Sequence, residues 1–117
     1  MLNCLCESER TNELKVEADI SADPLWCNKC SANLDLEVIP LSNELKEELT
    51  HWVLKYGEWI DWDNDERIVL NGVKMENDHN KQGERLTVRV KGELEPEYAV
   101  RFSPATFAAS TYGHHRN

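Results

Sequence analysis

The chain has 117 residues, of which 40% are hydrophobic and 30% are charged, and its formal net charge is −9. This length and composition indicate one globular domain over residues 1–117 and exclude a largely disordered chain. No apolar run of about 18 residues could span a membrane, and the N-terminus lacks a basic stretch followed by an apolar segment, so we expect the protein in the cytoplasm.

Four cysteines lie in two close pairs. One residue separates Cys4 from Cys6, two residues separate Cys27 from Cys30, and twenty residues lie between the pairs. In a reducing compartment such pairs are more typical of a metal site than of disulfides. Zn²⁺ prefers four thiolates at about 2.3 Å, and each pair supplies two from one tight turn. We predict one structural Zn²⁺ held by all four. The alternatives are a metal site in which His51 or a carboxylate replaces Cys4 as the fourth ligand, a redox dithiol at Cys27 and Cys30, and free thiols.

The segment between the cysteine pairs predicts a strand and a turn. Leu14, Val16 and Ala18 alternate with charged residues, and the turn-forming sequence 21–24 follows. With the cysteine pairs, residues 3–40 resemble a zinc ribbon, although ribbons usually have two residues inside the first pair. The chain is also similar to small uncharacterised proteins of bacteria and prophages. The resemblance implies a β unit held by a structural metal ion.

An amphipathic helix is predicted over about 43–57. Ser42 is a suitable N-cap, and acidic residues follow it, where the helix dipole favours negative charge. The expected buried stripe has the spacing of one helix face and consists of Leu45, Leu49, Trp52, Val53 and Tyr56.

The acidic segment after this helix contains two further tryptophans. Its aspartates begin like a calcium-binding loop, but the sixth position lacks the required glycine, so we expect a solvated acidic turn. Tryptophans are enriched at the anchoring positions of protein interfaces. The candidate partner-binding residues are therefore Trp59, Trp62, Asp61, Asp63 and Asp65.

The remainder of the chain predicts mixed secondary structure. Asn71–Gly72 is typical of a tight hairpin, here over 67–75. A second helix is predicted over about 78–95, with a strand as the alternative for 77–94, and a strand is predicted over 98–102. Small and polar residues predict a flexible tail over 105–117. The fold class is thus α+β, with the zinc-ribbon-like part in 1–40 and the α+β remainder in 41–104.

No catalytic constellation is recognisable. The sequence has no G-x-S-x-G, no phosphate-binding glycine loop and no H-E-x-x-H. His51 is interpreted as a surface histidine, and His79 as part of a polar helix start. Four thiolates would leave no open position for catalysis on zinc. We therefore expect a protein that is not an enzyme.

The charge distribution favours a protein partner. The net charge is −5 over 1–40, −6 over 41–80 and +2 over 81–117. An acidic surface repels nucleic acid and attracts basic surfaces. We predict a protein-interaction module with a basic partner, in one version an inhibitor or anti-defence protein of phage or prophage origin. The alternatives are a nucleic-acid-associated zinc-ribbon protein of transcription or translation, and a thiol redox protein using Cys27 and Cys30.

Overall fold

The structure is a computed structural model that describes residues 2–63 and 67–108, and it is α+β as predicted. No helix in these two ranges is long and apolar enough to cross a membrane. In chain order the elements are β1 Leu2–Asn3, β2 Arg10–Thr11, β3 Glu13–Val16, β4 Leu25–Cys27, β5 Asn33–Leu34, the 3₁₀ turn η1 Leu36–Val38, α1 Asn43–Leu54, β6 Ile60–Asp61, β7 Arg67–Ile68, α2 Gly72–Leu94 and β8 Ala99–Phe102.

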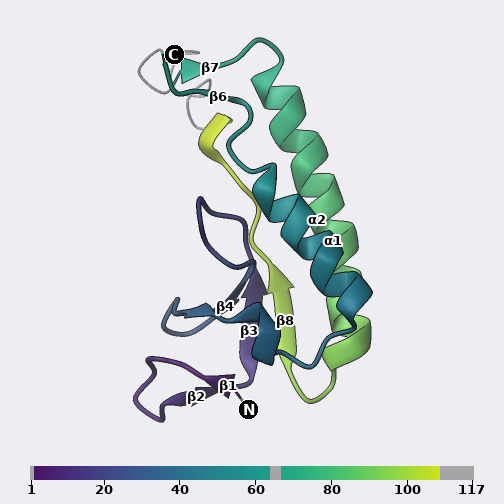
Figure 1. Ribbon diagram of the computed structural model, residues 1–117. Helices are drawn as coiled ribbons and strands as arrows, with labels where there is room; N and C mark the ends of the chain where they lie inside the picture. Colours follow the sequence, from purple (N-terminus) through teal and green to yellow (C-terminus); the bar gives the residue numbers. More distant parts are fainter. Residues whose placement is uncertain (1, 64–66, 109–117) are drawn as a thin grey trace.

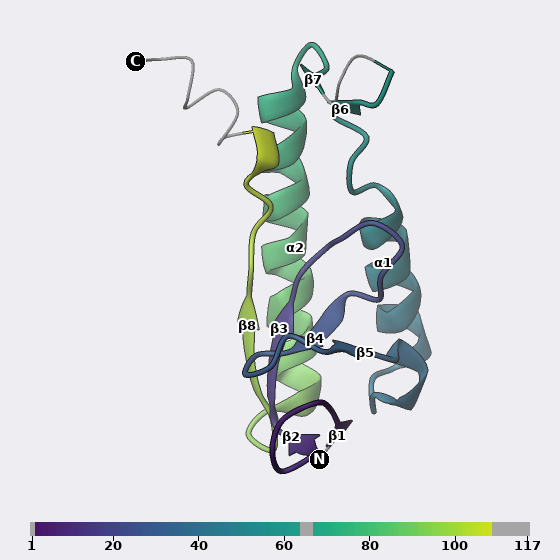
Figure 2. The same ribbon diagram turned by 90° about the vertical axis from the view of Figure 1, so that its left-hand side faces the viewer.

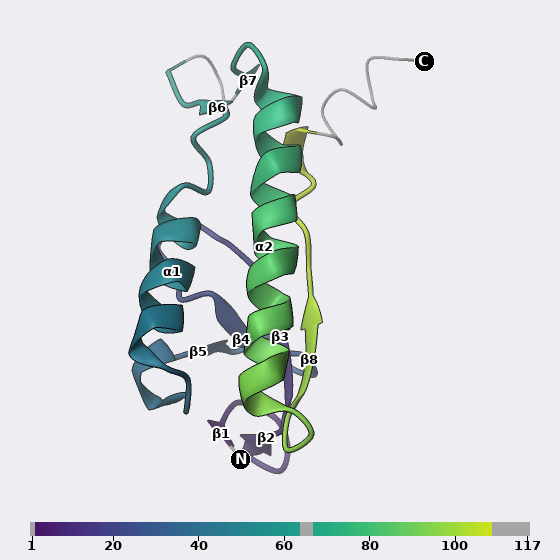
Figure 3. The ribbon, with the colours of Figure 1, turned by 90° about the vertical axis from the view of Figure 1, so that its right-hand side faces the viewer.

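The two helices lie side by side and antiparallel against one face of the main sheet (Figures 1 and 3). The β1–β2 hairpin lies at one end of the molecule, and the β6–β7 hairpin lies at the other. The longest dimension of the molecule is 43 Å. Figure 2 shows the loop between β3 and β4 reaching across toward the C-terminal part of α1.

The main sheet has the strand order β5-β4-β3-β8. β3 pairs antiparallel with β4 and parallel with β8, in a register that places Leu14 opposite Val100. Successive side chains of a strand point to opposite faces. Leu14, Val16 and Val100 are accordingly buried in the main core, whereas Lys15 and Arg101 alternate with them and are more exposed.

α1 forms where its capping signal and apolar stripe predict a helix. The Ser42 side chain accepts a hydrogen bond from the Leu45 N–H, and α1 runs over Asn43–Leu54. The predicted last turn to residue 57 is not helical, since Gly57 adopts a φ of +91° that ends regular helix. Trp52 is buried in the main core, as predicted.

The hairpin predicted over 67–75 is wrong. Asn71 does adopt the left-handed conformation expected of such a turn, with φ 68° and ψ 14°. The turn, however, leads directly into α2 at Gly72, and β7 pairs with β6 instead. The predicted second helix is confirmed but begins six residues earlier than residue 78. It ends at Leu94, before Pro96, which cannot continue a helix.

Close packing between α2 and its neighbours depends on Gly83. A Cβ at this position would lie 2.5 Å from Phe102 Cε1 and 2.6 Å from Trp52 Cζ2, closer than real contacts allow. Glycine therefore lets the helix approach both aromatic rings. This close approach packs α2 against both β8 and α1, and the main core lies between the helices and the sheet.

The segment after β8 runs along α2, and the first four residues of the predicted flexible tail, 105–108, contact this helix through Ala105 and Ala108. The Asn80 side chain exchanges two 2.9 Å hydrogen bonds with the backbone of Ala105. The Ala108 N–H donates to the Glu76 carboxylate at 2.8 Å, and Ala108 is fully buried. The rest of that predicted tail, 109–117, lies outside the described residues.

Candidate functional site

The two cysteine pairs meet at the end of the molecule formed by the β1–β2 hairpin and the β4–β5 turn. Cys4 and Cys6 lie in the loop of the hairpin, Cys27 ends β4, and Cys30 lies in the turn that follows. The four Sγ atoms lie within 4.8 Å of one another, and those of Cys6 and Cys27 are 3.5 Å apart. The sequence-predicted ligand set is thus brought together in space.

Backbone geometry directs N–H groups at the sulfurs. The Cys6 N–H donates to Cys4 Sγ at 3.3 Å, and the Lys29 N–H donates to Cys27 Sγ at 3.4 Å. Both turns include a residue with positive φ, namely Glu9 at 61° and Ser31 at 62°. In both turns, a backbone N–H group therefore stabilises negative charge on the first sulfur of the cysteine pair.

The local environment favours a thiolate at Cys27. Burial opposes its ionisation, but hydrogen bonds from the Thr11 hydroxyl and from the Cys30 and Lys29 N–H groups outweigh burial and lower the pKa to about 6. Hydrogen bonds with Cys4 and Cys27 raise the pKa of the neighbouring Cys6 thiol. Since the thiolate is the form that binds metal, the lowered pKa of Cys27 favours metal binding at this sulfur.

The donor set fits a thiophilic metal ion. A tetrahedron with metal–sulfur distances of about 2.3 Å places its sulfurs about 3.8 Å apart, close to the separations in this cluster. Four sulfur donors select ions such as Zn²⁺ over Ca²⁺ or Mg²⁺. The cluster can therefore hold one metal ion, and its four donors would close the coordination shell.

The predicted partner-binding residues are not all on the surface. Trp59 is only 1% exposed, so it is not available as a surface anchor. With Ile60 and Ala108 it forms a small core at the β6–β7 end, which we call the distal core. Trp62 is 55% exposed, Asp63 is exposed and Asp61 is half-buried. Asp65 lies outside the described residues.

A buried histidine is the feature that the sequence interpretation missed. His79 lies inside α2, not at its start, and is 6% exposed. Its ring stacks on Trp52, with centroids 4.6 Å apart and an interplanar angle of 13°, and lies 5.1 Å from the ring of Trp59. Burial, with a contribution from the charge of Lys55, lowers its pKa to about 4. His79 is therefore neutral near pH 7.

A signal for this burial was present in the helix periodicity. Leu86, Val90 and Leu94 form the apolar stripe that predicted the helix, and the same face continues backwards through Gly83 and His79. Because these two residues are not apolar, a hydrophobic pattern does not identify them as core positions.

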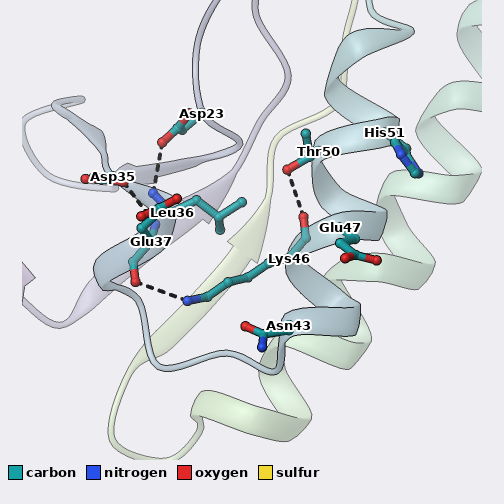
Figure 4. A pocket seen from close by; sticks show the side chains of 9 residues that line it. All are labelled: Asp23, Asp35, Leu36, Glu37, Asn43, Lys46, Glu47, Thr50 and His51. Atoms are coloured by element: carbon teal, nitrogen blue, oxygen red, sulfur yellow. Dashed lines mark hydrogen bonds between the residues drawn. The ribbon is translucent and has the colours of Figure 1, made fainter.

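A groove follows the side of α1 that faces the β3–β4 loop and η1. The larger of its two hollows has a volume of about 610 Å³ and lies between η1 and α1, as Figure 4 shows. Asp23 and Asp35 there accept hydrogen bonds from the Leu36 and Glu37 N–H groups, both at 2.9 Å. Lys46 reaches across from α1 and donates to the Glu37 carbonyl at 3.1 Å. The Lys46 contact joins α1 to η1, the Asp23 contact joins the β3–β4 loop to η1, and acidic groups remain along the groove.

The fold and site define a small α+β protein with a cysteine cluster at one end and an acidic groove along one helix. Comparison with protein families gives a match to the family described as Serratia CdiI immunity protein-like, over residues 12–105. This match covers about four fifths of the chain, and the protein belongs to that family. It includes Cys27 and Cys30 but begins after Cys4 and Cys6. No curated protein matches the chain.

Proposed function

We propose that this chain is an immunity protein of bacterial contact-dependent inhibition, which neutralises a protein toxin by binding to it. The observation that carries the proposal is the family match over residues 12–105, which spans the main sheet strands β3, β4, β5 and β8 and both helices. Binding alone is sufficient for this role, so the protein is proposed not to be an enzyme. The sequence predicted an inhibitor or anti-defence protein, and the family match supports the more specific proposal of an immunity protein. The phage or prophage origin stays a prediction.

The proposed toxin has a basic binding surface. With a formal net charge of −9, the chain attracts basic surfaces at long range and accelerates productive encounters with them. Fast association suits an immunity protein, because the toxin must be captured before it acts.

The cysteine cluster is proposed to hold one structural Zn²⁺ through Cys4, Cys6, Cys27 and Cys30. The four sulfurs within 4.8 Å and the N–H groups directed at two of them support this assignment. The ion would join the β1–β2 loop to the β4–β5 turn. Native mass spectrometry of untagged protein is expected to show one zinc ion that a chelator removes.

Growth rescue tests the proposed function. The toxin encoded next to this chain in its genome is expressed in a sensitive host, with and without the chain. Co-expression is expected to restore growth, and the two purified proteins are expected to form a complex in calorimetry. Continued growth arrest, with no complex formed by the two folded proteins, would contradict the proposal.

A further inference from the structure

The groove along α1 continues beyond its acidic part into an apolar part. This second hollow has a volume of about 380 Å³ and shares Asp23 and Thr50 with the first, so the two adjoin. Its apolar lining comes from the β3–β4 loop, from the C-terminal end of α1 and from the turn that follows α1, and consists of Ile20, Ala22, Pro24, Val53, Leu54 and Tyr56. We call the two hollows together the α1 groove.

Large apolar side chains are exposed along the apolar part of the α1 groove. Leu54 is 71% exposed and Ile20 is 49% exposed, although both are residues that usually favour burial. Trp62, 55% exposed, lies beside Ile20: a Cβ added at Gly57 would be 3.0 Å from Ile20 Cδ1 and 3.6 Å from Trp62 Cζ2. Neighbouring exposed apolar side chains of this kind typically mark a protein-binding surface.

The acidic part of the α1 groove carries excess negative charge. It is lined by four carboxylates and one lysine, a net charge of −3 with neutral histidine; the carboxylates are Asp23, Asp35, Glu37 and Glu47. Within residues 2–63 and 67–108, none of these four forms an ion pair with a lysine or arginine. Lys46 donates to a backbone carbonyl instead of pairing with one of them. Positive charge is therefore what this part of the groove lacks.

The negative potential extends to the apolar part. Burial raises the pKa of Tyr56, and the nearby carboxylates of Asp19, Glu76 and Glu17 raise it further. All residues that line the groove lie between positions 20 and 56, within the acidic first 80 residues of the chain. The α1 groove is therefore built from the acidic part of the sequence.

We infer that the α1 groove, with Trp62 at its apolar end, is the toxin-binding surface, and that it takes an apolar side chain of the toxin flanked by lysine or arginine. This inference rests on the proposed function, since it names the binding surface of the same activity. The apolar part provides a desolvated contact for the anchor, and the acidic part complements the flanking charges. Hot spots of interfaces combine these two features, a packed anchor with a charged rim.

The apolar contact is tested with the Leu54→Glu and Trp62→Ala variants. Both side chains are more than half exposed, so the fold should tolerate the changes, as circular dichroism and melting would verify. Each is expected to weaken toxin binding about tenfold or more in calorimetry. Val88→Glu is the matched control, because Val88 is 67% exposed on α2 and lies outside the α1 groove. Its affinity for the toxin should stay within about twofold of wild type.

The acidic contact is tested with Glu47→Lys, and Glu84→Lys on α2 is its control, since both residues are exposed. We expect Glu47→Lys to slow association severalfold at low salt, with a smaller difference at high salt, because rim charges act mainly on the association rate. Glu84→Lys changes net charge equally but should slow association less.

The outcomes separate the inference from the proposed function. If the wild-type chain neither binds the toxin nor restores growth, the proposed function fails, and the inference fails with it. If the wild type binds while Leu54→Glu, Trp62→Ala and Glu47→Lys match their controls, the toxin binds elsewhere and only the inference is overturned. Selective loss of affinity in the groove variants supports it.

Discussion

The two ends of the molecule are stabilised by different chemistry. At the β1–β2 end, strands of two residues are connected by loops whose four sulfurs converge within 4.8 Å. At the β6–β7 end, the strands are equally short, but Trp59, Ile60 and Ala108 form a distal core with aromatic contacts to Tyr56 and His79. One end is thus suited to an exchangeable ion, and the other depends on packing. Each end should therefore respond to treatments that leave the other unchanged.

The largest expected effect is the loss of the cysteine end in Cys27→Ser. This side chain is fully buried, and its sulfur lies 3.5 Å from that of Cys6. Because structural zinc contributes on the order of 10 kcal/mol to small domains, we expect the free energy of unfolding to fall by about 5 kcal/mol or more, with loss of the ion. Metal content by native mass spectrometry and hydrogen exchange over residues 2–34 would measure both changes.

Leu5→Ser is the control for this prediction, since Leu5 lies between two of the cysteines and is 83% exposed. It should keep the metal ion and the stability of the wild type. If Cys27→Ser retains one tightly bound zinc ion, the four-cysteine assignment is wrong.

At the other end, Trp59→Ala should lower the free energy of unfolding by about 3–5 kcal/mol, because it empties much of the distal core. Trp62→Ala, in the same segment but 55% exposed, should cost less than about 1 kcal/mol. Denaturant unfolding monitored by circular dichroism measures both. The metal content of both variants should equal that of the wild type, and metal loss in Trp59→Ala would show that the ends are coupled.

The distal end should also weaken in mild acid. The pKa of His79 is about 4 in the folded protein, below the ordinary value of 6.5. Between these values the unfolded chain binds a proton that the folded protein does not, so stability falls as the pH drops from about 6.5 toward 4. The loss reaches about 2 kcal/mol at pH 5, at 1.4 kcal/mol per pH unit.

His79→Phe isolates this effect because it keeps an aromatic ring against Trp52 and removes the titration. Wild type and variant share the titrations of the carboxylates and cysteines, so the difference between their unfolding free energies reports on His79. We expect that difference to change by about 2 kcal/mol between pH 7 and pH 5. A difference independent of pH would show that His79 titrates alike in both states.

The smallest expected effect is that of Ser42→Ala, a substitution that touches neither the cysteine cluster nor the distal core. Ser42 caps α1, and its backbone N–H and hydroxyl both donate to the Glu93 carboxylate of α2. Ser42→Ala should lower the unfolding free energy by about 1 kcal/mol without changing metal content or the pH dependence. A larger loss in thermal unfolding would show that the Glu93 contact contributes more than an ordinary cap.

The features that the sequence predicts well depend on neighbouring residues. Ser42 caps the helix it precedes, and each cysteine pair has its ligand spacing within three or four residues. The features that were mispredicted depend on distant contacts. Asn71 forms the left-handed turn expected of it, but whether a strand or a helix follows is decided by packing against the rest of the fold.

The candidate binding surfaces also depend on contacts between distant residues, which the sequence does not reveal. Trp59 is buried partly because the ring of His79, which lies 20 residues further along the chain, packs against it. The α1 groove joins the β3–β4 loop, η1 and α1, and no local pattern indicates that these lie together. Tertiary contacts between separate segments explain why the groove was absent from the sequence interpretation.

The parallel pairing of β3 with β8 has a consequence for synthesis of the protein. Val16 lies opposite Phe102, which leaves the ribosome 86 residues later, since 102 − 16 = 86. At translation rates of about 5–20 residues per second, about 4–17 seconds pass between the synthesis of β3 and that of β8. All four cysteines emerge within the first 30 residues, so the nascent chain can form its sulfur cluster before the main sheet is complete. The main sheet is therefore completed only after the C-terminal strand β8 has been translated.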